Sequence, residues 1–182
     1  MRPLLFAALA ISLSVPATAA LAPGARAPEF TASGAIAGQP VTVSLKAALK
    51  KGPLVLYFFP AAFTQGCNVE AAAFAEALPD FTAAGATVIG MTAGNVDQLA
   101  KFSSAHCAGK FAVAAATPEI VKGYDVLLKK ADGTPTTITS RTSFVIAPNG
   151  KIIFAHTDMS PAAHIRMSLE AVRNYRKTHP RG

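Results

Sequence analysis

Short runs of apolar residues divide the chain into predicted strands. Residues 54–59 contain only apolar or aromatic side chains, and residues 87–91 form a second, mostly apolar run. Continuous apolar runs of this length are typical of strands that are buried on both faces of a sheet. Residues 41–45 alternate between apolar and polar side chains, which predicts a half-buried strand. Residues 20–40 are rich in alanine, glycine and proline without a clear period, and we expect an extended segment there.

Helices are predicted between these strands. The alanine-rich residues 66–84 favour a helix, in which Pro79 should cause a kink or break and Gly85 should end the last turn. Residues 95–104 predict a further helix, because their first residues, an asparagine followed three positions later by a glutamine, resemble a capping box. A short strand is expected near residues 111–114.

The second half of the chain predicts two more helices and a hairpin. Thr117 precedes a proline and a glutamate, which is the order of a helix cap and first turn. Residues 129–141 are polar and are expected to form a loop. Residues 143–147 and 151–156 are predicted strands, and the Pro-Asn-Gly between them favours a β-hairpin. The last helix should begin at Ser160.

The order of these elements indicates an α/β fold. A strand, a helix and a second strand require a right-handed crossover, so the two buried strands should be parallel, whereas the hairpin adds antiparallel strands. This order predicts a mixed central sheet with helices on both faces, which is the thioredoxin-like layout. The chain of 182 residues has the length of one domain, and it contains no internal repeat.

The first residues have the pattern of a secretory signal peptide. Arg2 supplies a positive charge, residues 4–15 form an apolar stretch, and residues 17–19 are a small-x-small cleavage site. A membrane anchor is the alternative, but the apolar stretch is shorter than the ~20 residues that a spanning helix needs. We expect residues 1–19 to be removed, which leaves a thioredoxin-like domain over residues 20–182. The sequence thus predicts an exported, periplasmic protein with no stable membrane insertion after cleavage.

The formal charge of the chain is +7, and without the signal segment, which holds one charge, it is +6. The basic residues near the C-terminal end are Arg166, Arg173, Arg176, Lys177 and Arg181. They would suit either a nucleic-acid surface or a solvated helix face. No aromatic platform or nucleic-acid motif accompanies them, so we favour the solvated face and expect no nucleic-acid partner.

The chain has two cysteines, Cys67 and Cys107. In an oxidising compartment an even count suggests either a structural disulfide or a reversible, catalytic one. Cys67 falls in the first turn of a predicted helix, where free N–H groups and the helix dipole favour a reactive thiolate. The alternative is a small buried apolar residue. Gly66 would let a substrate approach the backbone closely, and Thr64 would place a hydroxyl near the sulfur.

The segment around Cys67 resembles the active-site signature of peroxiredoxins, Pro-x-x-x-Thr-x-x-Cys. Pro60, Thr64 and Cys67 stand at its three defining positions. Residues 57–59 before the signature and Glu70 after it are also similar to that family. The combined spacing favours the reactive interpretation of the cysteine over the buried apolar one.

Two other segments are similar to the same family. Residues 141–146 resemble the peroxiredoxin strand that carries an active-site arginine, here Arg141, and residues 24–30 resemble the usual opening of the chain. The resemblance extends over residues 22–175 and is greatest to the Q-type, or bacterioferritin comigratory protein-like, subgroup. That subgroup belongs to the alkyl hydroperoxide reductase and thiol-specific antioxidant superfamily. Without Cys67 the arginine would be interpreted as a surface charge at a strand end.

The resemblance implies a thiol-dependent peroxidase that reduces hydrogen peroxide or organic hydroperoxides. Arg141 and the helix start would hold Cys67 as a thiolate, which attacks a peroxide oxygen and becomes a sulfenic acid. Thr64, backbone N–H groups and Arg141 would stabilise charge on the leaving oxygen. The residues expected to support the substrate site are Pro60, Gly66 and Glu70. A thioredoxin-like or other thiol reductant would reset the enzyme, which is expected to need no metal or organic cofactor and to be a monomer or weak dimer.

The chain departs from many Q-type members at two positions. Gln65 stands where many have proline, and Ala72 stands where many have a second cysteine. Because that nearby partner is missing, we expect Cys107 to condense with the Cys67 sulfenic acid into an intramolecular disulfide. The first helical turn would have to unwind to bring the Cα atoms to disulfide distance. The alternative is that an external thiol resolves the sulfenic acid and Cys107 is a buried apolar residue.

Three other functions fit a thioredoxin-like layout. A copper chaperone would need Cys-x-x-x-Cys with a histidine ligand, and a disulfide oxidoreductase would need Cys-x-x-Cys; the sequence has neither pair. The four histidines show no metal-ligand spacing and receive no role: His106, His156, His164 and His179. A non-catalytic thiol redox sensor on the same fold is not excluded by the sequence.

Overall fold

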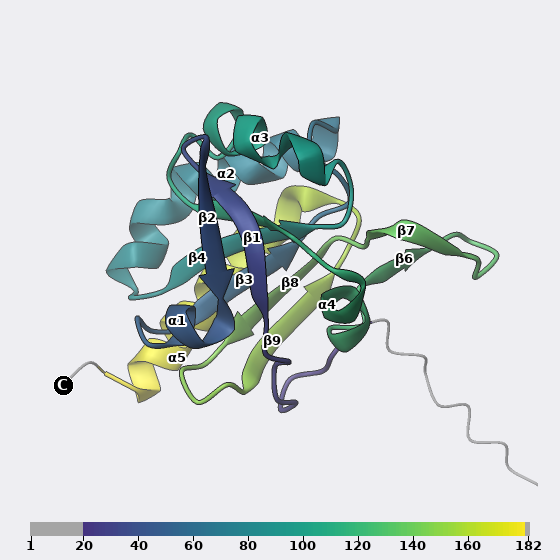
Figure 1. The fold of residues 1–182 in the computed structure, drawn as a ribbon. Helices are drawn as coiled ribbons and strands as arrows, with labels where there is room; N and C mark the ends of the chain where they lie inside the picture. The colour runs from purple at the N-terminus through teal and green to yellow at the C-terminus, as the bar shows by residue number, and fades with distance from the viewer. Residues whose placement is uncertain (1–19, 181–182) are drawn as a thin grey trace, which may run out of the picture.

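A seven-stranded mixed sheet forms the centre of the part of the chain that the computed structural model describes, residues 20–180 (Figure 1). Its strands lie in the order β2-β1-β5-β4-β3-β8-β9. Strands β3, β4 and β5 are parallel, and the other neighbours are antiparallel. The bounds are β1 Thr31–Ile36, β2 Gln39–Ser44, β3 Leu54–Phe58, β4 Thr87–Thr92, β5 Ala112–Ala115, β8 Thr142–Ile146 and β9 Ile152–Thr157. The predicted mixed α/β fold is therefore confirmed.

Strand β3 separates two hydrophobic clusters, one on each face of the sheet. All five of its residues are buried. Leu54, Leu56 and Phe58 belong to one cluster, whereas Val55 and Tyr57 belong to the other, because successive side chains of a strand point to opposite faces. An uninterrupted apolar run is what a strand with two buried faces requires.

Helices cover both faces of the sheet, as predicted. Helices α2, α3 and α5 contribute to the cluster that contains Tyr57, and the shorter α1 and α4 contribute to the cluster that contains Phe58. Figure 1 shows α2 and α5 behind the sheet and α4 on the opposite side. The bounds are α1 Leu45–Leu49, α2 Gln65–Ala83, α3 Leu99–Ala105, α4 Pro118–Gly123 and α5 His164–Thr178.

Helix α2 continues through Pro79, so the predicted break does not occur. A proline inside a helix cannot donate a hydrogen bond to the carbonyl four residues earlier. That carbonyl belongs to Ala75, and it accepts a hydrogen bond of 3.1 Å from the ammonium group of Lys110 instead. A charged side chain from outside the helix thus compensates for the missing backbone donor. Gly85 follows the helix with a φ of 77°, as expected for a residue that ends a helix.

The capping box predicted at Asn95 does not form. This residue adopts a left-handed conformation with a φ of 54°, and its side-chain amide donates a 2.8 Å hydrogen bond to the carbonyl of Ala62. The side chain therefore connects two loops, and a 3₁₀ turn over Val96–Gln98 leads into α3. The cap predicted at Thr117 does form. The last helix was expected to begin at Ser160, but Ser160 caps a 3₁₀ turn over Pro161–Ala163, and α5 begins at His164.

Two segments contain strands that the sequence pattern did not predict. Strand β1 lies within the segment expected to be merely extended, residues 20–40. It packs closely against β5, since a Cβ atom at Gly34 would clash with the β5 backbone. Strands β6 (Leu127–Lys129) and β7 (Pro135–Thr139) form a projecting hairpin where a loop was expected (Figure 1). These strands are recognised by their backbone pairing with neighbouring strands, because their sequences show no clear alternation of apolar and polar residues.

The predicted signal peptide, residues 1–19, lies outside the described residues. Within residues 20–180, no helix is both long and apolar enough to cross a membrane.

Candidate active site

Cys67 lies in the first turn of α2, directly after the loop that follows β3. Its side chain is buried, with 1% of the residue exposed. The loop is held by neighbours on both sides: the Ala62 amide donates to the carbonyl of Gly94 at 3.3 Å, and Asn95 donates to the Ala62 carbonyl. The N-terminal end of the helix, with its unpaired N–H groups, therefore has a fixed position relative to the end of the sheet.

Arg141 reaches Cys67 from the start of β8, which is far away in the sequence. Its Nη2 atom lies 3.6 Å from the Cys67 Sγ atom, and its Nε atom donates to the carbonyl of Met159 at 3.0 Å. Only 3% of the arginine is exposed, so it is not a surface charge. A buried cation beside a sulfur atom stabilises the thiolate form of that sulfur.

Glu70 completes the contacts of the Arg141 guanidinium. It lies three residues after Cys67, which places both side chains on the same face of α2. The Nη1 atom of Arg141 donates to the Oε2 atom of Glu70 in a fully buried ion pair. Burial raises the pKa of Glu70 to about 8, and the nearby guanidinium opposes part of that rise. A single arginine therefore contacts both the Cys67 sulfur and a buried carboxyl group.

Gly66 provides space for this arginine. A Cβ atom at position 66 would lie 3.1 Å from Nη2 of Arg141, which is closer than ordinary van der Waals contact. The sequence suggested that the glycine leaves room for substrate. In the structure, the group that approaches its backbone is the guanidinium.

Thr64 and Pro60 lie in the loop before the helix, and each takes part in a hydrogen bond between a threonine hydroxyl and a backbone carbonyl. The exposed Thr64 donates its hydroxyl hydrogen to the carbonyl of Ala61 at 3.0 Å, and Thr64 makes no hydrogen bond with Cys67. The buried Pro60 carbonyl accepts a 3.0 Å hydrogen bond from the Thr92 hydroxyl of β4. Both residues therefore fix the loop that presents the cysteine.

His164 is a neighbour of this site that the sequence did not identify. It is fully buried at the start of α5. Its Nε2 atom donates to the carbonyl of Asp158 at 2.9 Å, so in the neutral ring Nδ1 accepts from the Ser143 hydroxyl at 2.8 Å. Nδ1 also lies 4.0 Å from the Oε1 atom of Glu70. Burial is the largest influence on the His164 pKa, which falls to about 4.

The burial of His164 could have been predicted from the helical spacing of its neighbours. The residue precedes Ser168 by four positions and Val172 by eight, and all three share the buried face of α5. A lone histidine at a helix start has no motif, so its proximity to Glu70 could not be inferred from the sequence.

Cys107 lies just beyond α3 and is also fully buried. It belongs to the same hydrophobic cluster as Cys67, on the same face of the sheet. Both cysteines are free thiols in this structure. Burial raises the pKa of Cys107 to about 12, so in this conformation the thiol holds its proton at neutral pH.

Comparisons with known proteins identify the family. The AhpC/TSA family matches residues 23–155. A Mycobacterium tuberculosis protein that carries the peroxiredoxin name is 31% identical over 149 residues, which are 81% of this chain and 92% of that protein. Peroxiredoxin Bcp of Xanthomonas campestris is 27% identical over 125 residues, which are 68% of this chain and 78% of the relative.

Solved structures agree with this assignment. The crystal structure of peroxidoxin BcpB from Mycobacterium tuberculosis superposes with a TM-score of 0.72 at 25% identity, over 84% of this chain and 96% of that one. The bacterioferritin comigratory protein of Xanthomonas campestris has a TM-score of 0.67 at 26% identity, over 79% and 90%. The expected thioredoxin-like fold is confirmed. The chain belongs to the AhpC/TSA family, and it is a peroxiredoxin, a thiol-dependent peroxidase.

Proposed function

We propose that Cys67 is the residue that attacks the peroxide. The observation that carries this proposal is the 3.6 Å contact between its sulfur and the buried Arg141 guanidinium at the start of α2. The positive charge and the free N–H groups of the first helical turn favour the thiolate, which is the nucleophilic form. Hydrogen peroxide and organic hydroperoxides are the proposed substrates.

The first step transfers one oxygen atom to the sulfur. The Cys67 thiolate attacks one peroxide oxygen, the O–O bond breaks, and the other oxygen leaves as water or an alcohol after it takes up a proton. The guanidinium and the N–H groups of the helix start are preorganised to stabilise the negative charge that moves onto the leaving oxygen. The sulfur is oxidised to a sulfenic acid, and the peroxide is reduced by two electrons.

Cys107 is the proposed resolving residue. Its thiol displaces the sulfenic hydroxyl of Cys67, so that a disulfide forms and water is released. Both cysteines are buried, Cys67 is part of a helix, and the Cys107 thiol holds its proton in this conformation. Unwinding of the first turn of α2 and exposure of the segment after α3 would therefore have to accompany this step. A thioredoxin-like or other thiol reductant returns the disulfide to two thiols.

Peroxide consumption by the purified protein in the presence of dithiothreitol tests the role of Cys67. Cys67→Ser should abolish turnover, because a hydroxyl of similar size does not form the required nucleophile at neutral pH. Cys107→Ser is the matched control: in the absence of dithiothreitol or any other thiol it should still reduce one equivalent of peroxide and accumulate a sulfenic acid. Turnover that survives in Cys67→Ser would refute the assignment.

A non-catalytic thiol sensor is the alternative function, and the same measurement decides it. A sensor would react stoichiometrically and would not complete repeated cycles with the reductant, whereas the proposed enzyme continues until the peroxide is exhausted.

Export to the periplasm is part of the proposal as well. The intact mass of the protein from its native compartment should correspond to a chain that begins near Ala20, and a mass that includes residues 1–19 would rule this out.

A further inference from the structure

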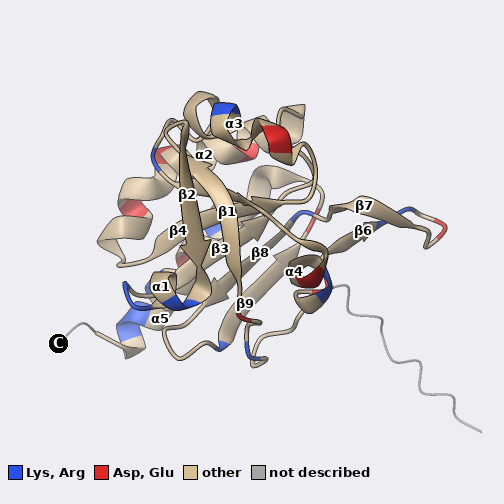
Figure 2. Ribbon diagram, in the orientation of Figure 1, with Lys and Arg blue, Asp and Glu red and all other residues tan. Residues whose placement is uncertain are grey.

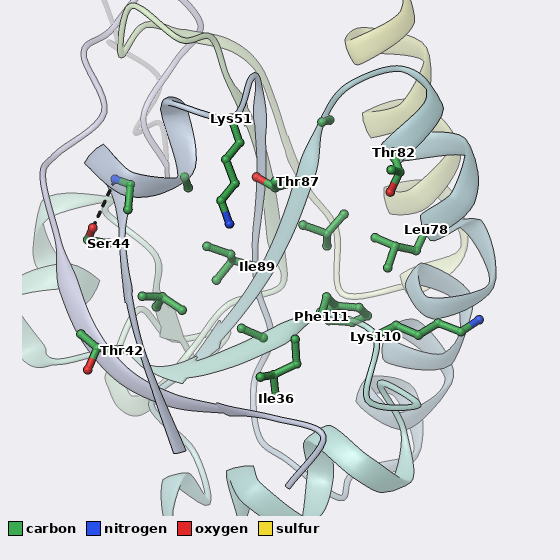
Figure 3. A pocket seen from close by; sticks show the side chains of 16 residues that line it. Ile36, Thr42, Ser44, Lys51, Leu78, Thr82, Thr87, Ile89, Lys110 and Phe111 are labelled. Atoms are coloured by element: carbon green, nitrogen blue, oxygen red, sulfur yellow. Dashed lines mark hydrogen bonds between the residues drawn. The ribbon is translucent and has the colours of Figure 1, made fainter. Parts of the chain in front are cut away.

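A cavity at the opposite end of α2 from Cys67 plays no part in the proposed reaction. It lies between β2, α1, the last turns of α2 and the first residues of β4 and β5 (Figure 3). Its volume is about 360 Å³, which is within the ~300–1,000 Å³ range of small-molecule sites. None of its lining residues contacts the Cys67 sulfur, so it is a separate site. We call it the β2–α2 cavity.

Most of the wall of the β2–α2 cavity is apolar. The large apolar side chains that line it come from β1, β2, α2, β4 and the residue before β5: Ile36, Val43, Leu78, Val88, Ile89 and Phe111. They belong to both hydrophobic clusters, and small alanines of α1 and β5 also line the cavity. An aliphatic chain is the chemical group that such a wall would remove from water most favourably.

A positive charge is directed into this apolar space. Figure 3 shows the Lys51 side chain extending from the turn after α1 into the cavity, with its ammonium group above Ile89. No carboxylate within residues 20–180 forms an ion pair with Lys51. The other lysine of the lining, Lys110, donates a hydrogen bond to the Ala75 carbonyl of α2.

The charges around the cavity also favour an anion. Among its lining residues, all of which are described, none is acidic. Lys46 and Lys50 are exposed on and just after α1. Figure 2 shows basic residues on α1, on the turn that follows it and on the last turns of α5, all at one end of the molecule. A ligand carboxylate near Lys51 would be attracted by this positive charge, and no carboxylate of the lining would compete with it for the lysine.

We propose that the β2–α2 cavity binds a free medium-chain fatty acid. The alkyl chain lies along Val43, Leu78 and Ile89, and the carboxylate accepts a hydrogen bond from the Lys51 ammonium. An apolar wall with one unpaired cation matches the two halves of such a molecule.

Isothermal titration calorimetry with decanoate, below its micelle-forming concentration, tests this proposal. We expect saturable binding at one site. Lys51→Met keeps the length of the side chain and removes the charge, so it should weaken decanoate binding about fivefold, which is the upper end for a partly exposed ion pair. Lys46→Met is the matched control, because Lys46 lies nearby on α1 but outside the lining, and it should weaken binding clearly less than Lys51→Met does. Decanol, which has no charge, should bind Lys51→Met as well as it binds the unmodified protein.

A second variant tests the cavity itself. Ala47 is exposed and lines the cavity, so Ala47→Phe fills the space without disturbing the core and should abolish binding, with an unchanged circular dichroism spectrum as evidence of folding. Absence of saturable binding, equal weakening by both lysine variants, or undiminished binding to folded Ala47→Phe would overturn the proposal. Sedimentation with phosphatidylglycerol vesicles separates a free acid from a membrane lipid. Vesicle binding that Ala47→Phe abolishes would assign the cavity to a lipid and overturn our choice.

Discussion

At the scale of single residues, the site depends on one guanidinium with two different neighbours. Arg141 contacts the Cys67 sulfur through one nitrogen and the Glu70 carboxyl group through another. A lysine could not reproduce this arrangement, because its ammonium is a single point charge without the planar fork of arginine. Gly66 is small enough to let the fork approach the helix start. The Cys67 sulfur is therefore contacted by a residue that lies 74 positions away in the sequence.

Replacement of Arg141 should slow the reaction with peroxide while the fold is retained. Arg141→Met removes one preorganised donor and the charge beside the sulfur, and we expect the second-order rate constant to fall ~10²–10³-fold. Stopped-flow peroxide consumption measures this rate constant. Arg173→Met, which removes an exposed partner of Asp80, is the control and should react at the normal rate; equal rates for both variants would contradict the role of Arg141.

His164 should make the protein less stable in mild acid. Its folded-state pKa of about 4 lies below the ordinary value of 6.5, so the unfolded chain takes up a proton first as the pH falls. Above pH 6.5 the ring is neutral in both the folded and the unfolded chain, so it costs no stability. As the pH falls from 6.5 towards about 4, the free energy of unfolding should decrease by on the order of 2–3 kcal/mol.

The variant His164→Gln keeps a donor for the Asp158 carbonyl but does not titrate. Urea unfolding at several pH values should show a smaller loss of stability across this range than in the unmodified protein. His179→Gln is the control, because His179 is exposed at the end of α5. If His164→Gln loses as much stability between neutral pH and about pH 4 as the unmodified protein, the buried neutral histidine is not responsible for the loss.

At the scale of elements, α2 carries the reactive cysteine at one end and an unusual proline near the other. Pro79 leaves the Ala75 carbonyl without its helical donor, and Lys110 supplies one from outside the helix. A tertiary contact therefore supports the helix where its own backbone lacks a donor. The sequence alone predicted a kink or break at this position.

A double-mutant cycle tests this compensation. Lys110→Met should lower the free energy of unfolding by about 1–2 kcal/mol, because a buried carbonyl loses a charged donor. In a Pro79→Ala background, the backbone N–H of residue 79 can bond to the same carbonyl, so Lys110→Met should cost markedly less. Urea denaturation of the four proteins gives the coupling energy. Equal costs in both backgrounds would show that Lys110 does not replace the missing donor.

At the scale of the whole molecule, the fold places both cysteines in one hydrophobic cluster but leaves them free. Each is covered by packing on the same face of the sheet as α2 and α3. In the proposed mechanism, formation of a disulfide between them is accompanied by local opening of the first turn of α2 and of the segment after α3, whose energetic cost is lower than that of global unfolding.

Oxidation should accordingly change the mobility of two segments together. After one equivalent of peroxide, peptide mapping should yield a Cys67–Cys107 cross-linked peptide. Hydrogen exchange should become faster in the first turn of α2 and in α3, because their helical hydrogen bonds open. Cys107→Ser supplies the control, in which exchange should stay close to that of the reduced protein. A lasting Cys67 sulfenic acid with Cys107 still free would show instead that an external thiol resolves it.

The sequence by itself determined the features that depend on neighbouring residues. The apolar run of β3, the helix that follows it and the spacing of Pro60, Thr64 and Cys67 lie within one continuous segment, so they could be interpreted without knowledge of the fold. The same holds for the β8–β9 hairpin with its Pro-Asn-Gly turn. Local periodicity and turn chemistry are properties of short windows, and the fold class follows from their order.

Only the tertiary structure decided which distant groups meet and which side chains lose contact with water. From the sequence, Arg141 was known only as part of a segment that resembles a family strand. The structure places it, buried, in contact with Cys67 and Glu70, and it places His164 next to Glu70. The unpredicted β1, β6 and β7 depend on backbone partners far along the chain or across a turn. The physical reason is the same in each case: burial and pairing are properties of the folded chain, and a single sequence carries no direct record of them.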